Sequence, residues 1–379
     1  MNMQTLSNED NLRLNVLLSQ NVQAIRIDEG KMIVYGLTDR GEAKIKLNPN
    51  VRDEKYIRSI KETISSHVLG SPGGYPVYIK RWTRMGQARD QSLESLLKLG
   101  EPEAIVAVIH AQGLTDEMAR RAWWAMPSAE NARRMLEKEA VAEGNMGRVL
   151  AEFLLEFLPY EEQARDIIES VRLVLQPGLI SEEERQSLWD KGQRKNVFRV
   201  GFLLAQPDAI PEQQHAHALF NECQITLQQP LAQGNVYARQ LQRIYSEQGQ
   251  SFLHTVESII GKPSNQDVVV MTLEAIRYYL HDIRLVGAGR REMDAIEQEV
   301  EQVFSTASDS MPEGLSELLA HQPEYENALK ALIKLASVGV DVVNPIFAQT
   351  DAIGTVMRRK LEPVSRPLLQ YCAELRGRA

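Results

Sequence analysis

Proline and glycine residues divide most of this chain into short amphipathic segments, and this punctuation constrains the fold more than any other feature. From Gln91 onward, helical patterns end repeatedly at a proline or glycine. The sequence predicts one helix that Thr115 caps and Pro127 ends, a single helix from Ser128 to Gly144, and a helix that starts with a capping box of Ser181 and Glu184. Proline lacks a backbone N–H and clashes with the preceding turn, so it is tolerated only at the start of a helix. In the later part of the chain, the prolines that interrupt the helical pattern are Pro207, Pro211, Pro230, Pro263, Pro312, Pro323, Pro345 and Pro363. Many short helices of this kind are typical of a solenoid-like stack or an irregular bundle.

The N-terminal part of the chain has a different pattern, in which strands alternate with helices. The expected elements are a helix after Ser7, strands at 24–27, 31–35, 43–47 and 75–79, and a helix at 54–69 that ends at Gly70. The predicted fold class is therefore mostly α, with a small N-terminal α+β domain and a multi-helical region. The predicted domains are the α+β domain (1–89), a helical domain (90–210) and a C-terminal helical region (211–379), which the sequence does not clearly separate from the second domain.

The charge distribution supports this division. Residues 1–89 carry 14 Lys+Arg against 9 Asp+Glu, a net charge of +5, whereas the whole chain has a net charge of −8. Such asymmetry usually marks units with different surroundings. With 43% hydrophobic residues and two cysteines, the composition excludes a disordered chain and a disulfide scaffold. No secretory signal pattern or membrane-length apolar stretch is found, so we expect a soluble, cytoplasmic protein.

The segment 116–126 is the most informative helix of the sequence. At about 100° per residue, its apolar residues form one face and Trp124 lies opposite, between Arg120 and Arg121. The structural interpretation is that Trp124 packs against a neighbouring helix beneath the arginine stems. The functional interpretation is a partner-binding surface, because Trp and Arg are favoured interface anchors. Arg120 and Trp124 are also spaced for a cation–π contact.

Two other clusters combine basic and aromatic residues. Arg81, Trp82 and Arg84 follow the last expected strand and suit a phosphate backbone or an acidic protein surface. The alternative is a domain junction in which Trp82 is packed and the charges are solvated. Segment 189–195 (WDKGQRK) is better interpreted as a solvated helix end or loop.

The sequence predicts no catalytic residue, no metal site and no cofactor. The segment with glycines at 287 and 289 lacks the third glycine and the final Gly-Lys-Ser/Thr of known phosphate-binding loops. It also follows a helix-like run and not a strand. His215 and His217 would point in opposite directions on a helix, so they could share a metal only in an extended loop. Cys223 and Cys372 belong to no CxxC pair and are expected to be buried and inert.

Three stretches share a pattern that belongs to no common catalytic motif. They are HVLGSPGGYPVY (67–78) with RWTRMG (81–86); GLTD (113–116) with RRAWWAMP (120–127) and ENARRML (130–136); and ESVRLVLQPGLI (169–180) with WDKGQRKN (189–196). Together they resemble the DsrS family, accessory proteins of dissimilatory sulfur oxidation that are encoded with the dissimilatory sulfite reductase system. The resemblance covers residues from about 6 to 210. It implies a cytoplasmic, cofactor-free protein with an auxiliary or regulatory role, including post-transcriptional control of sulfur-oxidation genes. It implies no catalytic residue.

Three hypotheses follow from these observations. The leading one is a non-enzymatic accessory protein of sulfur metabolism that holds a protein partner through Arg81, Trp82, Arg84, Arg120, Arg121 and Trp124. The first alternative is an RNA- or DNA-binding regulator that uses the basic N-terminal region, although the acidic remainder would repel nucleic acid outside a narrow footprint. The second alternative is a sulfur carrier or enzyme that depends on one of the two cysteines. The oligomeric state is not predicted.

Overall fold

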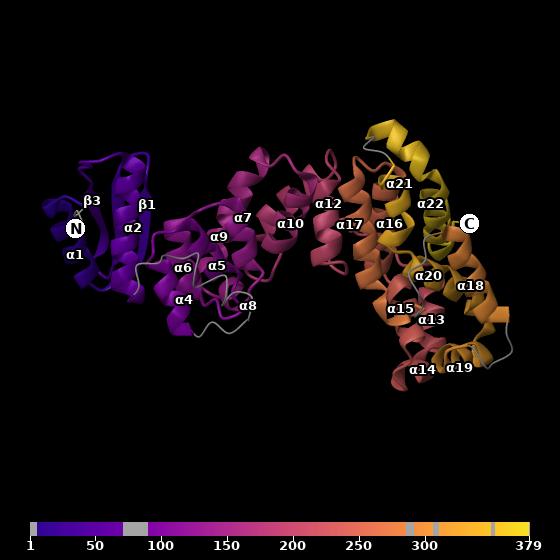
Figure 1. The fold of residues 1–379 in the computed structure, drawn as a ribbon. Coiled ribbons are helices and arrows are strands. Elements are labelled where there is room, and N and C mark those ends of the chain that lie inside the picture. Colours follow the sequence, from indigo (N-terminus) through magenta and orange to yellow (C-terminus); the bar gives the residue numbers. More distant parts are fainter. Residues whose placement is uncertain (1–5, 71–89, 286–291, 306–310, 350–352, 379) are drawn as a thin grey trace. The chain divides into compact units, whose positions relative to one another are not determined.

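A computed structural model describes residues 6–70, 90–285, 292–305, 311–349 and 353–378 of the chain (Figure 1). The chain forms two compact units, which we call unit 1 (Met1–Pro159 with Pro177–Ile180) and unit 2 (Tyr160–Gln176 with Ser181–Ala379). Unit 1 contains a small antiparallel sheet near the N-terminus, and the rest of the described chain is largely helical. The expected fold class is therefore confirmed. The expected strand at 75–79 lies outside the described residues.

The sheet has three antiparallel strands in chain order. The strands and the two helices beside them are β1 (Val22–Asp28), β2 (Ile33–Thr38), β3 (Gly41–Lys46), α1 (Asn8–Ser19) and α2 (Asp53–Leu69). In the register of these strands, Arg26 pairs with Tyr35 and Tyr35 pairs with Lys44. Since successive side chains point to opposite faces, these three residues share one face of the sheet.

The other face of the sheet forms the core of this N-terminal part. Its buried side chains include Val34 and Ile45 of the sheet, Leu14 and Leu17 of α1, and Ile60 of α2. At Gly36, a Cβ atom would lie 2.7 Å from a methyl group of Leu17, so α1 can pack this closely only because β2 has a glycine there. Ser7 caps α1 by accepting a hydrogen bond from the Asp10 N–H, as predicted.

Unit 1 continues as a series of short helices. They are α4 (Asp90–Leu97), α5 (Pro102–His110), α6 (Asp116–Ala125), α7 (Ala129–Leu136), α8 (Glu139–Ala142) and α9 (Asn145–Phe157). Both α4 and α6 contact β1. The single helix predicted between Ser128 and Gly144 is wrong, because Lys138 adopts an extended backbone that separates α7 from α8. The turn at Gly100 has a φ of +69° and packs on Ile25 and Ile27 of β1, which joins the helices to the sheet.

The described residues of unit 2 form helices joined by loops, without a strand. Its α-helices are α10 (Ala164–Val174), α11 (Glu182–Lys191), α12 (Val197–Ala205), α13 (Phe220–Thr226), α14 (Gln228–Ala232), α15 (Val236–Tyr245), α16 (Glu247–Gly261), α17 (Gln266–Tyr279), α18 (Met293–Ser305), α19 (Glu313–His321), α20 (Glu326–Ser337), α21 (Asn344–Phe347) and α22 (Gly354–Leu375). Ser181 and Glu184 form the predicted capping box at the start of α11. Helix α12 packs against α10 and α17, and α22 packs against α16 and α20.

The longest helix of unit 2 contradicts the expectation that every proline ends a helix. Helix α22 continues through Pro363 and Pro367. Its buried face, which includes Met357, Leu361 and Leu368, packs against two other helices. Burying each such side chain contributes about 1.5–3 kcal/mol, which is enough to offset a lost backbone hydrogen bond.

Candidate functional site

Helix α6 carries the predicted site residues, and its local sequence explains how it presents them. Thr115 caps the helix by accepting a hydrogen bond from the Met118 N–H at 3.2 Å, as predicted. Met118, Ala119 and Ala122 are buried on one face. The opposite face lies against the sheet. Trp124 on this face contacts two strands of the sheet, whereas the structural interpretation of the sequence placed it against a neighbouring helix.

Trp124 makes polar and aromatic contacts with two strands. Its indole N–H donates to the Glu42 carboxylate on β3, with 3.1 Å between the heavy atoms. The guanidinium of Arg26 on β1 lies 5.0 Å from the centre of the Trp124 ring. Arg26 also donates to the Trp124 carbonyl at 3.4 Å and forms an ion pair with Glu42 at the same distance. Trp124 thus joins α6 to both edge strands of the sheet.

Cationic and aromatic side chains alternate across this face. The Arg26 guanidinium lies 4.6 Å from the centre of the Tyr35 ring as well as 5.0 Å from that of Trp124. On β3, the Lys44 ammonium lies 5.7 Å from the Tyr35 ring centre. We call Arg26, Tyr35, Lys44, Arg120 and Trp124 the Arg26–Trp124 surface. Tyr35 and Trp124 are half-buried and Lys44 is exposed, so parts of both rings are open to solvent beside cations.

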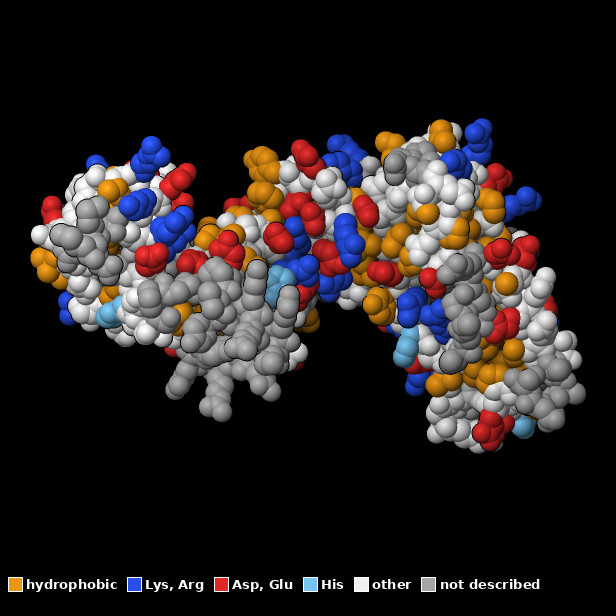
Figure 2. Space-filling model, in the orientation of Figure 1, with side chains coloured by type: hydrophobic (Ala, Val, Ile, Leu, Met, Phe, Trp, Pro, Cys, Tyr) orange, Lys and Arg blue, Asp and Glu red, His pale blue; other side chains and the backbone are white. Residues whose placement is uncertain are grey.

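The positive charge of the N-terminal part is visible in the space-filling view (Figure 2), which shows the side of the sheet that α2 covers. Over the region that Figure 1 labels β1 and α2, Figure 2 shows several Lys and Arg side chains with few acidic ones between them. This is the part of the chain whose sequence carries the positive net charge.

Arg120 and Arg121 are held by acidic neighbours. Arg120 donates to Glu117 and to the Gln23 side chain, each at 2.7 Å, so its guanidinium does not cover Trp124 as predicted; Arg26 does. Arg121 also donates to Glu117, and only 14% of its side chain is exposed. The hydrogen bond from Arg120, with a second one from Arg121, lowers the pKa of Glu117 to about 2. Arg120 is 42% exposed and remains the more accessible cation.

The second predicted cluster cannot be placed. Arg81, Trp82 and Arg84 lie outside the described residues, so their expected role stays a prediction.

Trp189 lies in the interior of unit 2, so the interpretation of 189–195 as a solvated segment is wrong for this residue. Its ring is 3% exposed, makes an edge contact with Phe202 at 5.1 Å, and is covered by the Arg199 guanidinium at the same distance. The sequence pattern missed this because the contacts come from α12, the next helix. Lys191, Arg194 and Lys195 are exposed, as expected.

Both cysteines are buried, as predicted. Burial raises the pKa of the Cys223 thiol to about 12, because the thiolate would lose its hydration. Burial also raises the pKa of Cys372.

His215 and His217 lie in a loop. The His217 ring stacks on the Tyr245 ring, with 4.1 Å between the ring centres, and burial lowers the pKa of His217. Among the residues that the structure describes, no three His, Cys, Asp or Glu side chains are grouped to hold a metal.

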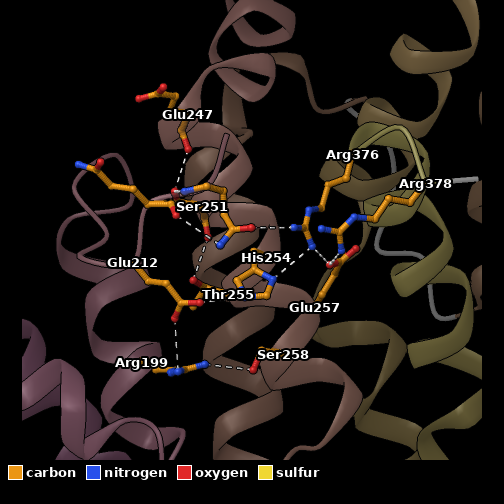
Figure 3. Close-up of polar contacts among 12 residues, drawn as sticks. Arg199, Glu212, Glu247, Ser251, His254, Thr255, Glu257, Ser258, Arg376 and Arg378 are labelled. Atoms are coloured by element: carbon orange, nitrogen blue, oxygen red, sulfur yellow. Dashed lines mark hydrogen bonds and ion pairs between the residues drawn. The ribbon is translucent and has the colours of Figure 1, made fainter. Parts of the chain in front are cut away.

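A polar network in unit 2 was not predicted (Figure 3). Glu212 lies 3.6 Å from the Arg199 guanidinium and accepts a hydrogen bond from His254 Nε2 at 3.1 Å. The other ring nitrogen of His254 faces Arg376 at 3.3 Å. Arg376, whose side chain is 2% exposed, forms an ion pair with Glu257. These residues come from distant segments, so no sequence motif could have indicated the network.

Within the described ranges, no helix combines the length and apolar character needed to cross a membrane. No protein-family model, curated protein or solved structure matches this chain. The resemblance to the DsrS family therefore stays a prediction from the sequence stretches quoted above.

Proposed function

We propose that this chain is a non-enzymatic, cytoplasmic accessory protein that holds a protein partner on the Arg26–Trp124 surface. The resemblance to DsrS proteins suggests that the partner belongs to the machinery of dissimilatory sulfur oxidation. The observation that carries the proposal is the placement of Arg26 between the Tyr35 and Trp124 rings.

The chemistry of this surface suits a protein partner with acidic and apolar groups. Tyr, Trp and Arg are the side chains most often found at the centre of protein interfaces. Here the cation–π contacts hold the guanidinium and both rings in place before a partner arrives, which reduces the entropy lost on binding. Lys44 at the open edge of the surface adds an attraction for acidic groups.

The experiment compares two matched tyrosine substitutions. Tyr35→Ala removes the central ring of the surface, whereas Tyr278→Ala removes a 73% exposed ring from unit 2. Purified proteins of the dissimilatory sulfite reductase system serve as immobilised ligands, and binding is measured by biolayer interferometry. We expect Tyr35→Ala to weaken binding about tenfold or more, the loss typical of an interface anchor. Equal binding by wild type and Tyr35→Ala, with unchanged circular dichroism, would remove this surface from the proposal.

Nucleic-acid binding is the second candidate, and the same alternation of rings and cations favours it. Bases stack on exposed aromatic side chains while cations contact the phosphates. Glu42 argues against it, because its carboxylate lies within the surface, beside Arg26 and Trp124. Fluorescence anisotropy with single-stranded RNA at low and physiological salt distinguishes the two candidates. Binding that falls steeply with salt and is lost in Tyr35→Ala would favour RNA over a protein partner.

A further inference from the structure

A cavity of about 730 Å³ lies in unit 2, where three helices begin. Its lining includes Ala164 in the first turn of α10, Asn196 and Val197 at the start of α12, and Asn265, which caps α17. These ends converge because α12 packs against both α10 and α17. The first N–H groups of a helix have no intrahelical partner and carry a partial positive charge, so three such ends favour an anion in the space between them.

Cationic side chains outnumber acidic ones in the lining of this cavity. The cations are Arg194, Lys195, Arg199, Lys262 and Arg358, and the acidic side chains are Glu161 and Glu162. The whole chain is acidic, with a net charge of −8, so this concentration of positive charge is local. A concave site with an excess of one charge attracts ligands of the opposite sign.

Most of these cations are available to a ligand. Within the described part of the chain, Arg194, Lys195 and Lys262 have no carboxylate within ion-pair distance. Arg358 donates to the hydroxyl of Thr355. Arg199 contacts Ser258 and Glu212, yet its Nε is buried without a hydrogen-bond partner. Arg199 therefore keeps one donor atom that no described residue engages.

The wall of the cavity is held in place by side-chain hydrogen bonds. The Asn196 amide donates to the Lys262 carbonyl at 3.1 Å, and the Ser264 hydroxyl donates to Asn196 at 2.9 Å. These contacts fix the start of α12 against the segment that joins α16 to α17. Asn265 is engaged as the cap of α17 through the Val268 N–H. The cavity therefore exists before a ligand binds, which lowers the cost of binding.

We propose that this cavity binds a small oxyanion with several negative charges, of the polyphosphate class. Its volume lies within the range of about 300–1,000 Å³ that is typical of small-molecule sites. The five cations are spread over α12, α22 and the segments before α12 and α17, so several charged groups are needed to engage them together. No aromatic side chain lines the cavity among the described residues, so recognition would depend on the phosphate groups and not on a stacked base.

This site is separate from the Arg26–Trp124 surface, so either proposal can fail without the other. Inorganic tripolyphosphate is the probe, and its binding is measured by isothermal titration calorimetry. The double substitution Arg194→Gln/Lys262→Gln removes two exposed cations without breaking an ion pair of the described residues. Arg358→Gln is a second, independent variant. Lys360→Gln, an exposed residue of α22 outside the lining, is the control and removes one positive charge, as Arg358→Gln does.

We expect wild type to bind tripolyphosphate and the double variant to bind about tenfold or more weakly, since charged hydrogen bonds contribute about 1.5–3 kcal/mol each. Lys360→Gln should stay within about twofold of wild type, because a single exposed charge outside the site is screened by salt. ATP should bind no more tightly than tripolyphosphate. Tighter ATP binding would instead show that a nucleoside is recognised and would contradict the phosphate-only chemistry.

Hydrogen exchange of the wild-type protein gives a second readout that does not depend on variants. Tripolyphosphate should increase protection at 194–200 and 262–268 and leave β1 to β3 unchanged. The proposal fails if millimolar tripolyphosphate causes no heat of binding and no protection. It also fails if Lys360→Gln loses as much affinity as the double variant, because the attraction would then be general and not confined to the cavity.

Discussion

The indole N–H of Trp124 on α6 donates to the Glu42 carboxylate on β3 at 3.1 Å, and Arg26 on β1 contacts both residues. This contact joins a helix of the multi-helical part to the small sheet. The same residues form the centre of the surface that we propose for a partner, so its geometry depends on how firmly α6 is held against the strands.

A double-mutant cycle tests how strongly Trp124 and Glu42 are coupled. Glu42→Ala removes the acceptor and Trp124→Phe removes the donor, so each variant loses the hydrogen bond and the double variant loses it once. We expect a coupling energy of about 0.5–1 kcal/mol, typical of a partly exposed hydrogen bond. Native-state hydrogen exchange at the β3 amides measures it locally. Glu54→Gln, an exposed residue of α2, is the control, and we expect it to change the opening free energy by less than about 0.5 kcal/mol.

A coupling energy near zero would show that α6 is held by its buried apolar face alone. The partner surface would then keep its residues but lose the fixed spacing between Trp124 and the strands.

Glu117 should make the stability of unit 1 depend on pH under acidic conditions. Hydrogen bonds from Arg120 and Arg121 lower its pKa from 4.5 to about 2. Folding therefore favours the charged form of Glu117. Its contribution to the free energy of unfolding is complete above pH 4.5 and is lost as the pH falls toward 2. Because the Glu117 side chain is 49% exposed, solvent screening limits this contribution to about 0.5–1 kcal/mol.

Carboxyl NMR provides the measurement for Glu117. The resonance should titrate near pH 2 in wild type, and Arg120→Gln should move the midpoint upward, toward 4.5. A midpoint that is already near 4.5 in wild type would show that the arginines do not hold this carboxylate in solution.

Local signals in the sequence predicted where helices begin. Ser7, Thr115 and Ser181 each cap a helix by accepting a hydrogen bond from the N–H group three residues further along, and such contacts depend only on neighbouring residues. The strand signals likewise predicted strands at 24–27, 31–35 and 43–47, although β2 begins at Ile33 and extends to Thr38. Local patterns do not show how strongly a helix packs against the rest of the fold. This tertiary packing allows α22 to continue past Pro363.

The candidate site was predicted only in part for the same reason. Trp124 and Arg120 stand out because they lie opposite the apolar face of their own helix. Arg26 and Tyr35 look like ordinary strand residues, and Arg26 meets Trp124 across 98 positions of sequence. The basic cavity of unit 2 is assembled from four separate segments, so its charge excess is visible only in the folded chain.

The cysteines should be unreactive in the native protein. With a pKa of about 12, Cys223 has a thiolate fraction at pH 8 that is lower than that of a free cysteine by a factor on the order of 10³. Burial has the same effect on Cys372. We therefore expect no adduct by mass spectrometry after polysulfide treatment of native protein, and two modified thiols after treatment in denaturing urea. A +32 Da adduct on either native thiol would instead support the sulfur-carrier hypothesis.

The ion pair between Arg376 and Glu257 should contribute most to the docking of the C-terminal end of α22 on α16. Only 2% of the Arg376 side chain and 18% of the Glu257 side chain are exposed, and Arg376 also donates to Gln214. Arg376→Gln would leave a largely buried carboxylate without its nearest cation, and breaking a buried pair in this way typically costs about 3–5 kcal/mol. Arg378→Gln is the matched control, because that side chain is 59% exposed and lies 4.0 Å from the same carboxylate.

Hydrogen exchange at the α16 and α22 amides distinguishes these variants. Arg376→Gln should lower the opening free energy of both helices by several kcal/mol, whereas Arg378→Gln should change it by less than about 0.5 kcal/mol. If the two variants behave alike, water must reach Glu257 when Arg376 is removed, and the pair would then stabilise no more than a surface salt bridge. Restoring protection by Glu257→Gln in the Arg376→Gln background would show that the unpaired charge, and not lost packing, causes the effect.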